Sequence, residues 1–263
     1  MTKKVIREAL RAGEIAVGFW QFILSPDVTE MIGEAGFDFV LLDTEHTGAS
    51  IDTVRACLTA ADAASIATVV RVAEKNQRYM IEQVLDAGAQ GVLVPTVETK
   101  EEALFAVKSA KFAPQGERGY CPAIRSGRWS SRPGFASRAN EETFVGIIVE
   151  SPLGLANLQE MLTVDGLDGV MIGGVDLSLR LGPNLERESL QTMTDEALRS
   201  ITASNKVAWL SVGDVSVARR SRAQMVCAGA DVSILTAALK AALGVGRSDV
   251  ASERREGVRA ASR

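Results

Sequence analysis

The sequence predicts a (β/α)8 barrel, and three observations point to this fold class. Short apolar runs rich in Val, Ile and Phe recur eight times along the 263 residues. The runs are continuous rather than alternating, which is typical of parallel strands buried on both faces. Stretches with helical periodicity lie between them. Eight strand–helix units in about 250 residues fit a barrel; a doubly wound sheet is the competing architecture.

The predicted strands are, in order, Ile15–Trp20, Phe37–Leu42, Ala67–Val72, Gly91–Pro95, Val145–Glu150, Gly169–Gly173, Val207–Val212 and Asp231–Leu235. Two intervening helices are indicated by their apolar faces, Pro26–Gly36 and Asn76–Gly88, and we expect Asn76 to cap the second. Their terminal glycines, and likewise Gly229, stand where a left-handed residue stops a helix.

The periodicity also predicts the domain organisation. A single barrel domain is expected over residues 1–245, followed by a polar C-terminal tail over residues 246–263. Phe112–Thr143 breaks the pattern, and a stretch of that length is usually a functional loop or a subunit contact. Its Arg125, Arg128 and Trp129 indicate either an anionic site or a subunit interface.

Composition narrows the function classes. The net charge of −4 gives no electrostatic reason to bind nucleic acid. No apolar run is long enough to cross a bilayer, and the N-terminus has no apolar signal region. The three cysteines are far apart, so we expect reduced thiols, no structural zinc site and a cytoplasmic protein.

Polar residues follow several predicted strands, where a barrel places its active site. Strand two ends in Asp43, Thr44, Glu45 and His46, and His46 is the only histidine. An acidic neighbour such as Asp43 can fix the tautomer of an imidazole and raise its basicity. Arg71 lies within an apolar run, so it either pairs with an acid of the site or binds an anionic substrate.

Two further carboxylates end the fifth and sixth strands. Glu150 and Asp176 are hard oxygen ligands that suit Mg²⁺ or Mn²⁺, although each could simply cap a following helix. The Gly173-Gly174 turn before Asp176 offers backbone N–H groups to a carboxylate. Trp20 ends strand one and either lines the site or packs at its rim. The sequence has no phosphate loop, nucleophile elbow or strand lysine for imine chemistry.

The motifs "FDFVLLDTEH", "VVRV", "DAGAQGVLVPTVET", "ERGYCPAIRSGRW", "VESPLGLANLQEMLTVDGLDGVMIGGVDLS" and "CAGADVSIL" resemble the HpcH/HpaI family of metal-dependent pyruvate aldolases. That family includes macrophomate-synthase-like and citrate-lyase-β-like relatives. The resemblance runs from Gly13 to Leu243 with the motifs in family order. It implies a (β/α)8 barrel in a homo-oligomer, a hexamer arranged as a trimer of dimers, with C-terminal helix exchange between subunits.

The resemblance also implies roles for individual residues. Glu150 and Asp176 match the metal ligands, and His46 with Asp43 matches the catalytic base dyad, with Glu45 beside it. Arg71 matches the catalytic arginine that contacts the pyruvyl oxygen. The implied substrate-binding positions are Arg71, Trp20, Glu45, Gly174, Val175 and Asp176.

The implied reaction is reversible aldol cleavage of a 4-hydroxy-2-oxo acid to pyruvate and an aldehyde, with Mg²⁺, Mn²⁺ or Co²⁺ as cofactor.

Two departures from the family pattern bear on the identity of the substrate. Ile148 stands where the family commonly has Gln, which removes a hydrogen-bond donor, and Gly174 replaces a Pro and loosens the turn. Ile148 favours an alternative, a decarboxylase or citrate-type condensing enzyme acting on oxaloacetate-like acids. A non-catalytic barrel that binds a 2-oxo acid is a third hypothesis. Acceptor specificity is expected from loops, particularly Phe112–Thr143, and from a neighbouring subunit.

Overall fold

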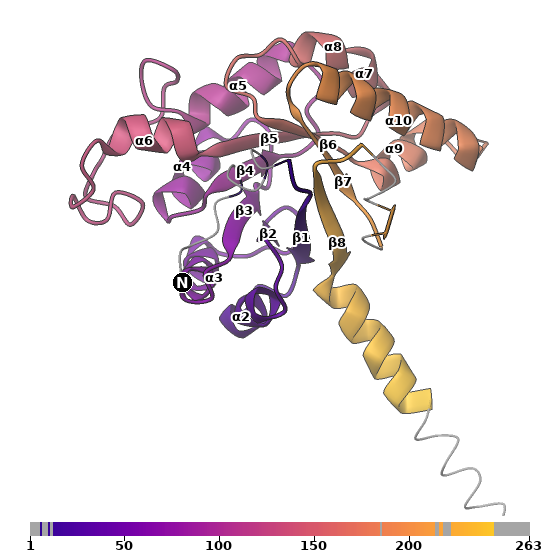
Figure 1. Ribbon diagram of the computed structural model, residues 1–263, viewed down its shortest axis with the longest axis horizontal. Helices are drawn as coiled ribbons and strands as arrows, with labels where there is room; N and C mark the ends of the chain where they lie inside the picture. The colour runs from indigo at the N-terminus through magenta and orange to yellow at the C-terminus, as the bar shows by residue number, and fades with distance from the viewer. Residues whose placement is uncertain are drawn as a thin grey trace, which may run out of the picture.

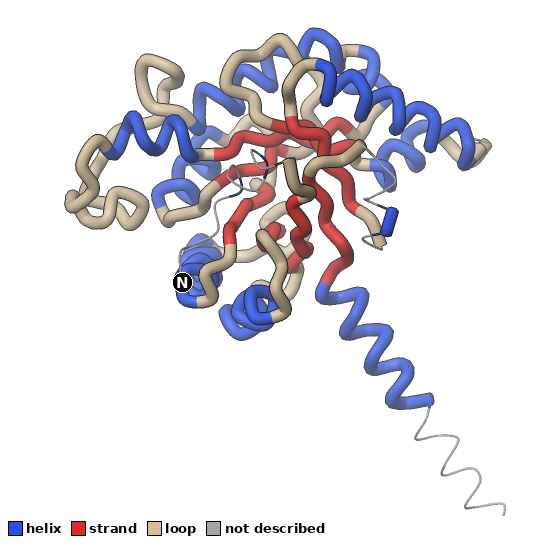
Figure 2. The backbone as a smooth tube through the Cα atoms, viewed as in Figure 1, coloured by secondary structure: helices blue, strands red, loops and turns tan. Residues whose placement is uncertain are grey.

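The computed structural model describes residues 6, 10, 13–184, 186–213, 216–217 and 222–244. Within them, eight parallel strands close into a barrel in the order β1 to β8, and β8 pairs with β1. Helices lie outside the ring of strands (Figures 1 and 2). The (β/α)8 barrel is therefore confirmed, and the doubly wound sheet is excluded.

Seven of the eight strands lie where the apolar runs predict them, within two residues at each end. The strands are β1 Ala16–Gln21, β2 Phe39–Asp43, β3 Ala67–Arg71, β4 Gly91–Val94, β5 Phe144–Val149, β6 Gly169–Ile172, β7 Val207–Ser211 and β8 Met225–Ala230. Most of these residues are buried, as continuous apolar strands between a barrel interior and an outer helix layer should be.

The prediction of an eighth strand at Asp231–Leu235 is wrong. β8 is Met225–Ala230, and residues 231–244 form a helix that leads away from the barrel (Figure 1). Gly229 lies inside β8 rather than after a helix. The Val-Ser-Ile-Leu run has strand propensity, but Met225, Val226 and Cys227 of β8 are the residues that pair with both β1 and β7. Tertiary pairing therefore overrides local propensity here.

The outer helices are α2 Pro26–Glu34, α3 Ile51–Ala63, α4 Arg78–Asp86, α5 Lys100–Ala110, α6 Phe135–Glu142, α7 Pro152–Ala156, α8 Leu158–Met161, α9 Gly174–Leu181 and α10 Arg187–Ala203. After α2 and α4, Gly36 and Gly88 adopt positive φ, as predicted for helix stops. The expected cap at Asn76 is wrong: α4 begins after Gln77, which makes no side-chain cap.

The segment between α5 and β5 lies at the amino end of the strands. Arg125 donates to the carbonyl of Ala87, just after α4, and pairs with Asp62 at the end of α3. Both helices end at the side of the barrel where the next strands begin. Within one subunit this segment is thus at the opposite end of the barrel from the carboxyl ends of the strands. It lies there because it connects a helix to the next strand and not a strand to the next helix. The expected part of Phe112–Thr143 in acceptor specificity stays a prediction.

No helix in the described ranges is long and apolar enough to span a membrane. The predicted tail, residues 246–263, lies outside the described residues.

Candidate active site

The candidate site is the carboxyl end of the barrel interior, here called the mouth. The interior cluster contains Leu41, Val69, Ile148 and Trp209, and the residues two positions further along these strands are Asp43, Arg71, Glu150 and Ser211. Because side chains alternate along a strand, all four continue the inward-facing rows. The barrel interior is therefore apolar along these strands and ends in a polar layer at the mouth.

Arg71 occupies the centre of this layer. Its Nε donates to Asp43 Oδ1 at 2.7 Å, and its Nη1 lies 3.1 Å from Glu45 Oε2. Asp43 and Arg71 are paired in register across β2 and β3, so the sheet itself holds them together. Both side chains are buried, which makes their pairing necessary.

Trp20 covers the guanidinium. The Arg71 Cζ lies 4.5 Å from the centroid of the Trp20 ring, a cation–π contact. The indole Nε1 donates to Ser211 Oγ at 3.1 Å, which links β1 to β7, the two strands on either side of β8. Trp20 is thereby fixed in orientation, and it limits the directions from which a ligand can approach Arg71.

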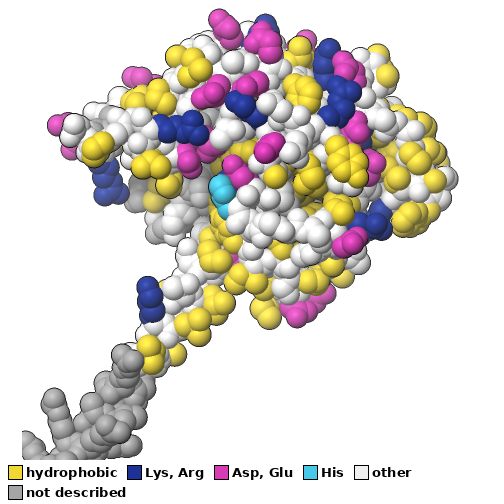
Figure 3. Space-filling model, turned by 180° about the vertical axis from the view of Figure 1, so that it is seen from behind, with side chains coloured by type: hydrophobic (Ala, Val, Ile, Leu, Met, Phe, Trp, Pro, Cys, Tyr) yellow, Lys and Arg dark blue, Asp and Glu magenta, His cyan; other side chains and the backbone are white. Residues whose placement is uncertain are grey.

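His46 lies at the rim of the mouth, and its side chain is 60% exposed. Figure 3 shows the single histidine at the surface beside acidic side chains. Its Nε2 is 3.6 Å from Glu45 Oε2. Asp43 accepts the backbone N–H groups of Glu45 and His46, which fixes the turn that carries both. In this arrangement Glu45 is the carboxylate nearest the ring, and Asp43 positions His46 through its backbone.

Glu150 is only 6% exposed and accepts the Thr96 backbone N–H at Oε1, 2.8 Å away. A Cβ on Gly173 would lie 2.7 Å from the other carboxylate oxygen, so this glycine leaves the room that Glu150 occupies. Asp176 is exposed in the first turn of α9. Its charge nevertheless acts on both Glu150 and Glu45.

Burial raises the pKa of Glu150, and the charges of Asp176 and Glu45 raise it further. Burial likewise raises the pKa of Glu45, with Arg71 and His46 acting in the opposite direction. Four carboxylates therefore share the mouth with one guanidinium. Such a site holds excess negative charge that an added cation would neutralise.

The residues present fit a divalent metal ion. Glu45 Oε2 is buried and accepts no hydrogen bond, despite its proximity to Arg71. Glu150 and Asp176 supply the oxygen donors that Mg²⁺ and Mn²⁺ prefer, and two protein carboxylates are enough for Mg²⁺, which usually retains several waters. Within the described residues, no group of three or more His, Cys, Asp or Glu side chains is already gathered as a metal cluster.

The sequence reasoning missed three residues of the mouth. Thr96 adopts φ +51° and binds Glu150 through its backbone, while Lys75 Nζ donates to the Thr96 carbonyl at 2.9 Å. Neither carries a sequence signal, because Thr96 acts through its main chain and Lys75 binds a main-chain carbonyl. Ser211 ends a strand and could have been found by the rule that identified Asp43 and Glu150.

Comparisons with known proteins show which family the chain is similar to. A family model described as HpcH/HpaI aldolase/citrate lyase matches residues 16–242. A hydroxypyruvate/pyruvate aldolase from Deinococcus radiodurans is 36% identical over 240 residues, 89% of this chain and 86% of the relative. A 4-hydroxy-2-oxo-heptane-1,7-dioate aldolase from Klebsiella pneumoniae is 34% identical over 235 residues, 87% of this chain and 88% of the relative.

A solved structure is also similar over most of its length. The citrate synthase SbnG superposes with a TM-score of 0.83 at 26% identity, covering 93% of this chain and 98% of that chain. Sequence and structure comparisons thus agree on a whole-barrel likeness that includes every strand carrying the mouth residues.

Proposed function

Because the chain belongs to the HpcH/HpaI aldolase/citrate lyase family, we propose that it cleaves a 4-hydroxy-2-oxo acid to pyruvate and an aldehyde, reversibly and with a divalent metal ion. The observation that carries the proposal is the buried Arg71 among carboxylates at the mouth. The names of its relatives, which are pyruvate and 4-hydroxy-2-oxo acid aldolases, support the same reaction class.

Glu150 and Asp176 would hold the metal ion, which supplies Lewis-acid stabilisation of negative charge. Arg71 places a fixed positive charge beside the pyruvyl oxygen, where negative charge develops as the C3–C4 bond breaks. In α9 the first intrahelical hydrogen bond is donated by Leu177. The N–H groups of Gly174, Val175 and Asp176 are therefore available to the substrate carboxylate.

His46 is the proposed base. Its imidazole accepts the proton of the 4-hydroxyl, the C3–C4 bond breaks, and the aldehyde leaves. The remaining pyruvate enolate takes a proton from solvent at C3 and becomes pyruvate, and the imidazolium releases its proton to solvent, which restores the base. Glu45 lies within 3.6 Å of the ring and stabilises the imidazolium that forms. Trp20 covers one face of the guanidinium, so the substrate reaches Arg71 from the side that the indole leaves open.

One observation favours the alternative of a condensing enzyme or decarboxylase acting on oxaloacetate-like acids. Ile148 is 1% exposed and lies 3.1 Å from the Cβ position of Gly173, directly below the Glu150 layer. An apolar side chain there provides no hydrogen bond to substrate. The whole-length likeness to a citrate synthase supports the same alternative.

We also propose a homo-oligomer, built as a hexamer. The helix over residues 231–244 leads away from the barrel and exposes Ile234, Leu235, Leu239 and Leu243. A helix with such an apolar face needs a partner, and a second copy of the chain, exchanging this helix, would supply one. The cytoplasmic location stays a prediction.

The proposal is tested by following the methyl protons of pyruvate by NMR in D₂O, first with Mn²⁺ or Mg²⁺ and then with EDTA. Exchange that requires the metal is expected, because the enolate forms without any aldehyde. Absence of exchange with every metal would contradict the pyruvate site. In that case loss of oxaloacetate, followed by the same method, would identify the alternative.

A further inference from the structure

A second cavity lies at the opposite end of the barrel from the mouth. It has a volume of about 670 Å³ and is bounded by the end of α4, the residues that precede β4 and β5, and the segment around α6. This volume is in the range of small-ligand sites. Five arginines line it: Arg118, Arg125, Arg128, Arg132 and Arg138. We call it the arginine cavity.

Acidic side chains do not balance these charges. Asp62 and Glu142 are the acids among the lining residues, and they pair with Arg125 and Arg132. Arg128 and Arg138 make no ion pair or side-chain hydrogen bond with any residue that the structure describes. The cavity therefore has an excess of positive charge.

Arg118 shows that the cavity is more than a charged surface. It is 5% exposed, donates to Asp86 Oδ1 at 2.6 Å and stacks on Phe112 with 4.4 Å between Cζ and the ring centroid. Its Nε nevertheless has no hydrogen-bond partner, and neither has the Ser126 hydroxyl. Unsatisfied buried polar groups are rare, and here two unsatisfied donors belong to residues that line one cavity.

The backbone around the arginine cavity allows close contacts between its lining residues. A Cβ on Gly88 would lie 2.4 Å from Arg125 Nη1, so the glycine admits the guanidinium to the Ala87 carbonyl. Arg128 and Trp129 both adopt positive φ and are held by backbone bonds from Arg128 to Arg125 and from Trp129 to Ile124. Strained backbone of this kind is found where the structure fixes side chains for a ligand.

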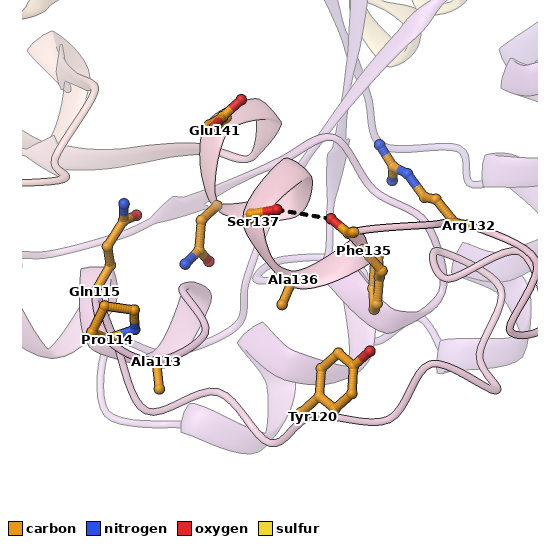
Figure 4. A pocket seen from close by; sticks show the side chains of 11 residues that line it. Ala113, Pro114, Gln115, Tyr120, Arg132, Phe135, Ala136, Ser137 and Glu141 are labelled. Atoms are coloured by element: carbon orange, nitrogen blue, oxygen red, sulfur yellow. Dashed lines mark hydrogen bonds between the residues drawn. The ribbon is translucent and has the colours of Figure 1, made fainter.

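Figure 4 shows the residues that line a neighbouring hollow. This hollow has a volume of about 460 Å³ and shares Arg132 and Phe135 with the arginine cavity. Its lining contains one arginine and one acid, Glu141, and the Ser137 hydroxyl there is already used by the Gly134 carbonyl. The lining of the hollow therefore has no excess charge. Of these two neighbouring cavities, it is the arginine cavity that has excess positive charge.

We propose that the arginine cavity binds a small multivalent oxyanion, either a phosphate group or a dicarboxylate. Planar guanidinium groups bind the oxygens of both anions in pairs, and Ser126 adds a hydroxyl donor. This site is separate from the mouth and does not depend on the aldol reaction.

Titration with inorganic phosphate at constant ionic strength tests the proposal, with binding followed by calorimetry and by melting temperature. Saturable binding is expected in the wild type, and it should be about tenfold weaker in Arg138→Gln, which removes an unpaired guanidinium. Arg199→Gln is the matched control, because it removes an exposed arginine of α10 outside the cavity. It should bind phosphate as the wild type does.

Absence of saturable binding, or equal affinity in both variants, would overturn the proposal. If Arg138→Gln does not fold, Ser126→Ala replaces it: this variant removes a hydroxyl that has no partner, so it should fold and bind phosphate several-fold more weakly. A parallel titration with malonate distinguishes the two ligand sources, because tighter binding of malonate identifies a dicarboxylate and tighter binding of phosphate a phosphate group.

Discussion

The exposed imidazole of His46 makes a sharp test of its role, because its removal disturbs little packing. We expect His46→Ala to lower kcat at least about a hundredfold, as is usual when a general base is lost. Its melting temperature should stay within about a degree of wild type, since surface substitutions change stability little. Steady-state kinetics with saturating Mn²⁺ and a thermal melt measure both. Turnover close to wild type would remove His46 from the mechanism.

Gly173 is required by the position of Glu150. In Gly173→Ala the new Cβ would lie 2.6 Å from the Glu150 Cβ, closer than real side chains approach. Because Glu150 must move, we expect activity to fall by at least tenfold and the metal concentration for half-maximal activity to rise. Gly119→Ala is the control, since nothing lies within 4 Å of its Cβ position. A Gly173→Ala variant with the wild-type metal requirement would contradict this role for Glu150.

At the residue scale, the sequence could predict Asp43, Arg71 and Glu150 because strand geometry places every second side chain inward. It could not predict that Asp43 binds Arg71 and that Glu45 is the carboxylate nearest His46. Both outcomes depend on how the turn after β2 folds back, and that path is determined by backbone hydrogen bonds to Asp43.

The loop between β4 and α5 acts as a unit that holds Glu150. Lys75 Nζ binds the Thr96 carbonyl and lies 2.7 Å from Glu102 Oε1, which also closes the capping box of α5 with Thr99. We expect Lys75→Met to lower kcat/KM about tenfold, the equivalent of one lost hydrogen bond. Because Lys75 acts through Thr96, the fall should lie mainly in kcat, and Lys75→Arg should restore part of it.

The matched control for this loop is Lys108→Met. It removes a lysine of α5 whose ammonium group pairs with Glu117. It should leave both kinetic constants near wild type. If the two variants behave alike, the Lys75 contact is structural and does not position Glu150.

At the element scale, periodicity and glycine stops predicted the positions of seven strands but not the position of β8. Met225–Ala230 contains small residues that look unlike a buried strand, whereas the helix after it begins with a β-branched run. Asp231 determines that boundary, because its carboxylate accepts the N–H groups of Phe22, Ile23 and Val232. Two of these three donors lie about 200 residues away in the chain, so no local pattern could reveal the boundary.

At the scale of the whole molecule, the helix over residues 231–244 should determine assembly. Leu239 is 61% exposed in the single subunit, so a charge there harms assembly and not the isolated barrel. We expect Leu239→Lys to lower the mass measured by light scattering, with Lys240→Gln on the same helix as the control. A mass equal to wild type would show that the subunits associate through another surface.

Metal binding should govern the stability of the whole barrel, and its pH dependence follows from the two buried carboxyls. The raised pKa values of Glu150 and Glu45 mean that the folded metal-free protein holds these protons more tightly than the unfolded chain does. Their contribution to stability is therefore complete below the ordinary carboxyl range and is lost as pH rises through the raised values. A divalent cation should reverse that loss at neutral pH.

We therefore expect Mn²⁺ to raise the melting temperature at pH 7, and by less as the pH approaches 4.5, where protons compete for the same oxygens. At a hundred times Kd the stabilisation is about 2.7 kcal/mol, roughly 5 °C or more for a chain of this size. In Glu150→Gln the shift should disappear at every pH, and melting without metal should depend less on pH, since a buried ionisable group is gone. A shift of equal size in Glu150→Gln would place the cation elsewhere and would remove the physical basis for a metal at the mouth.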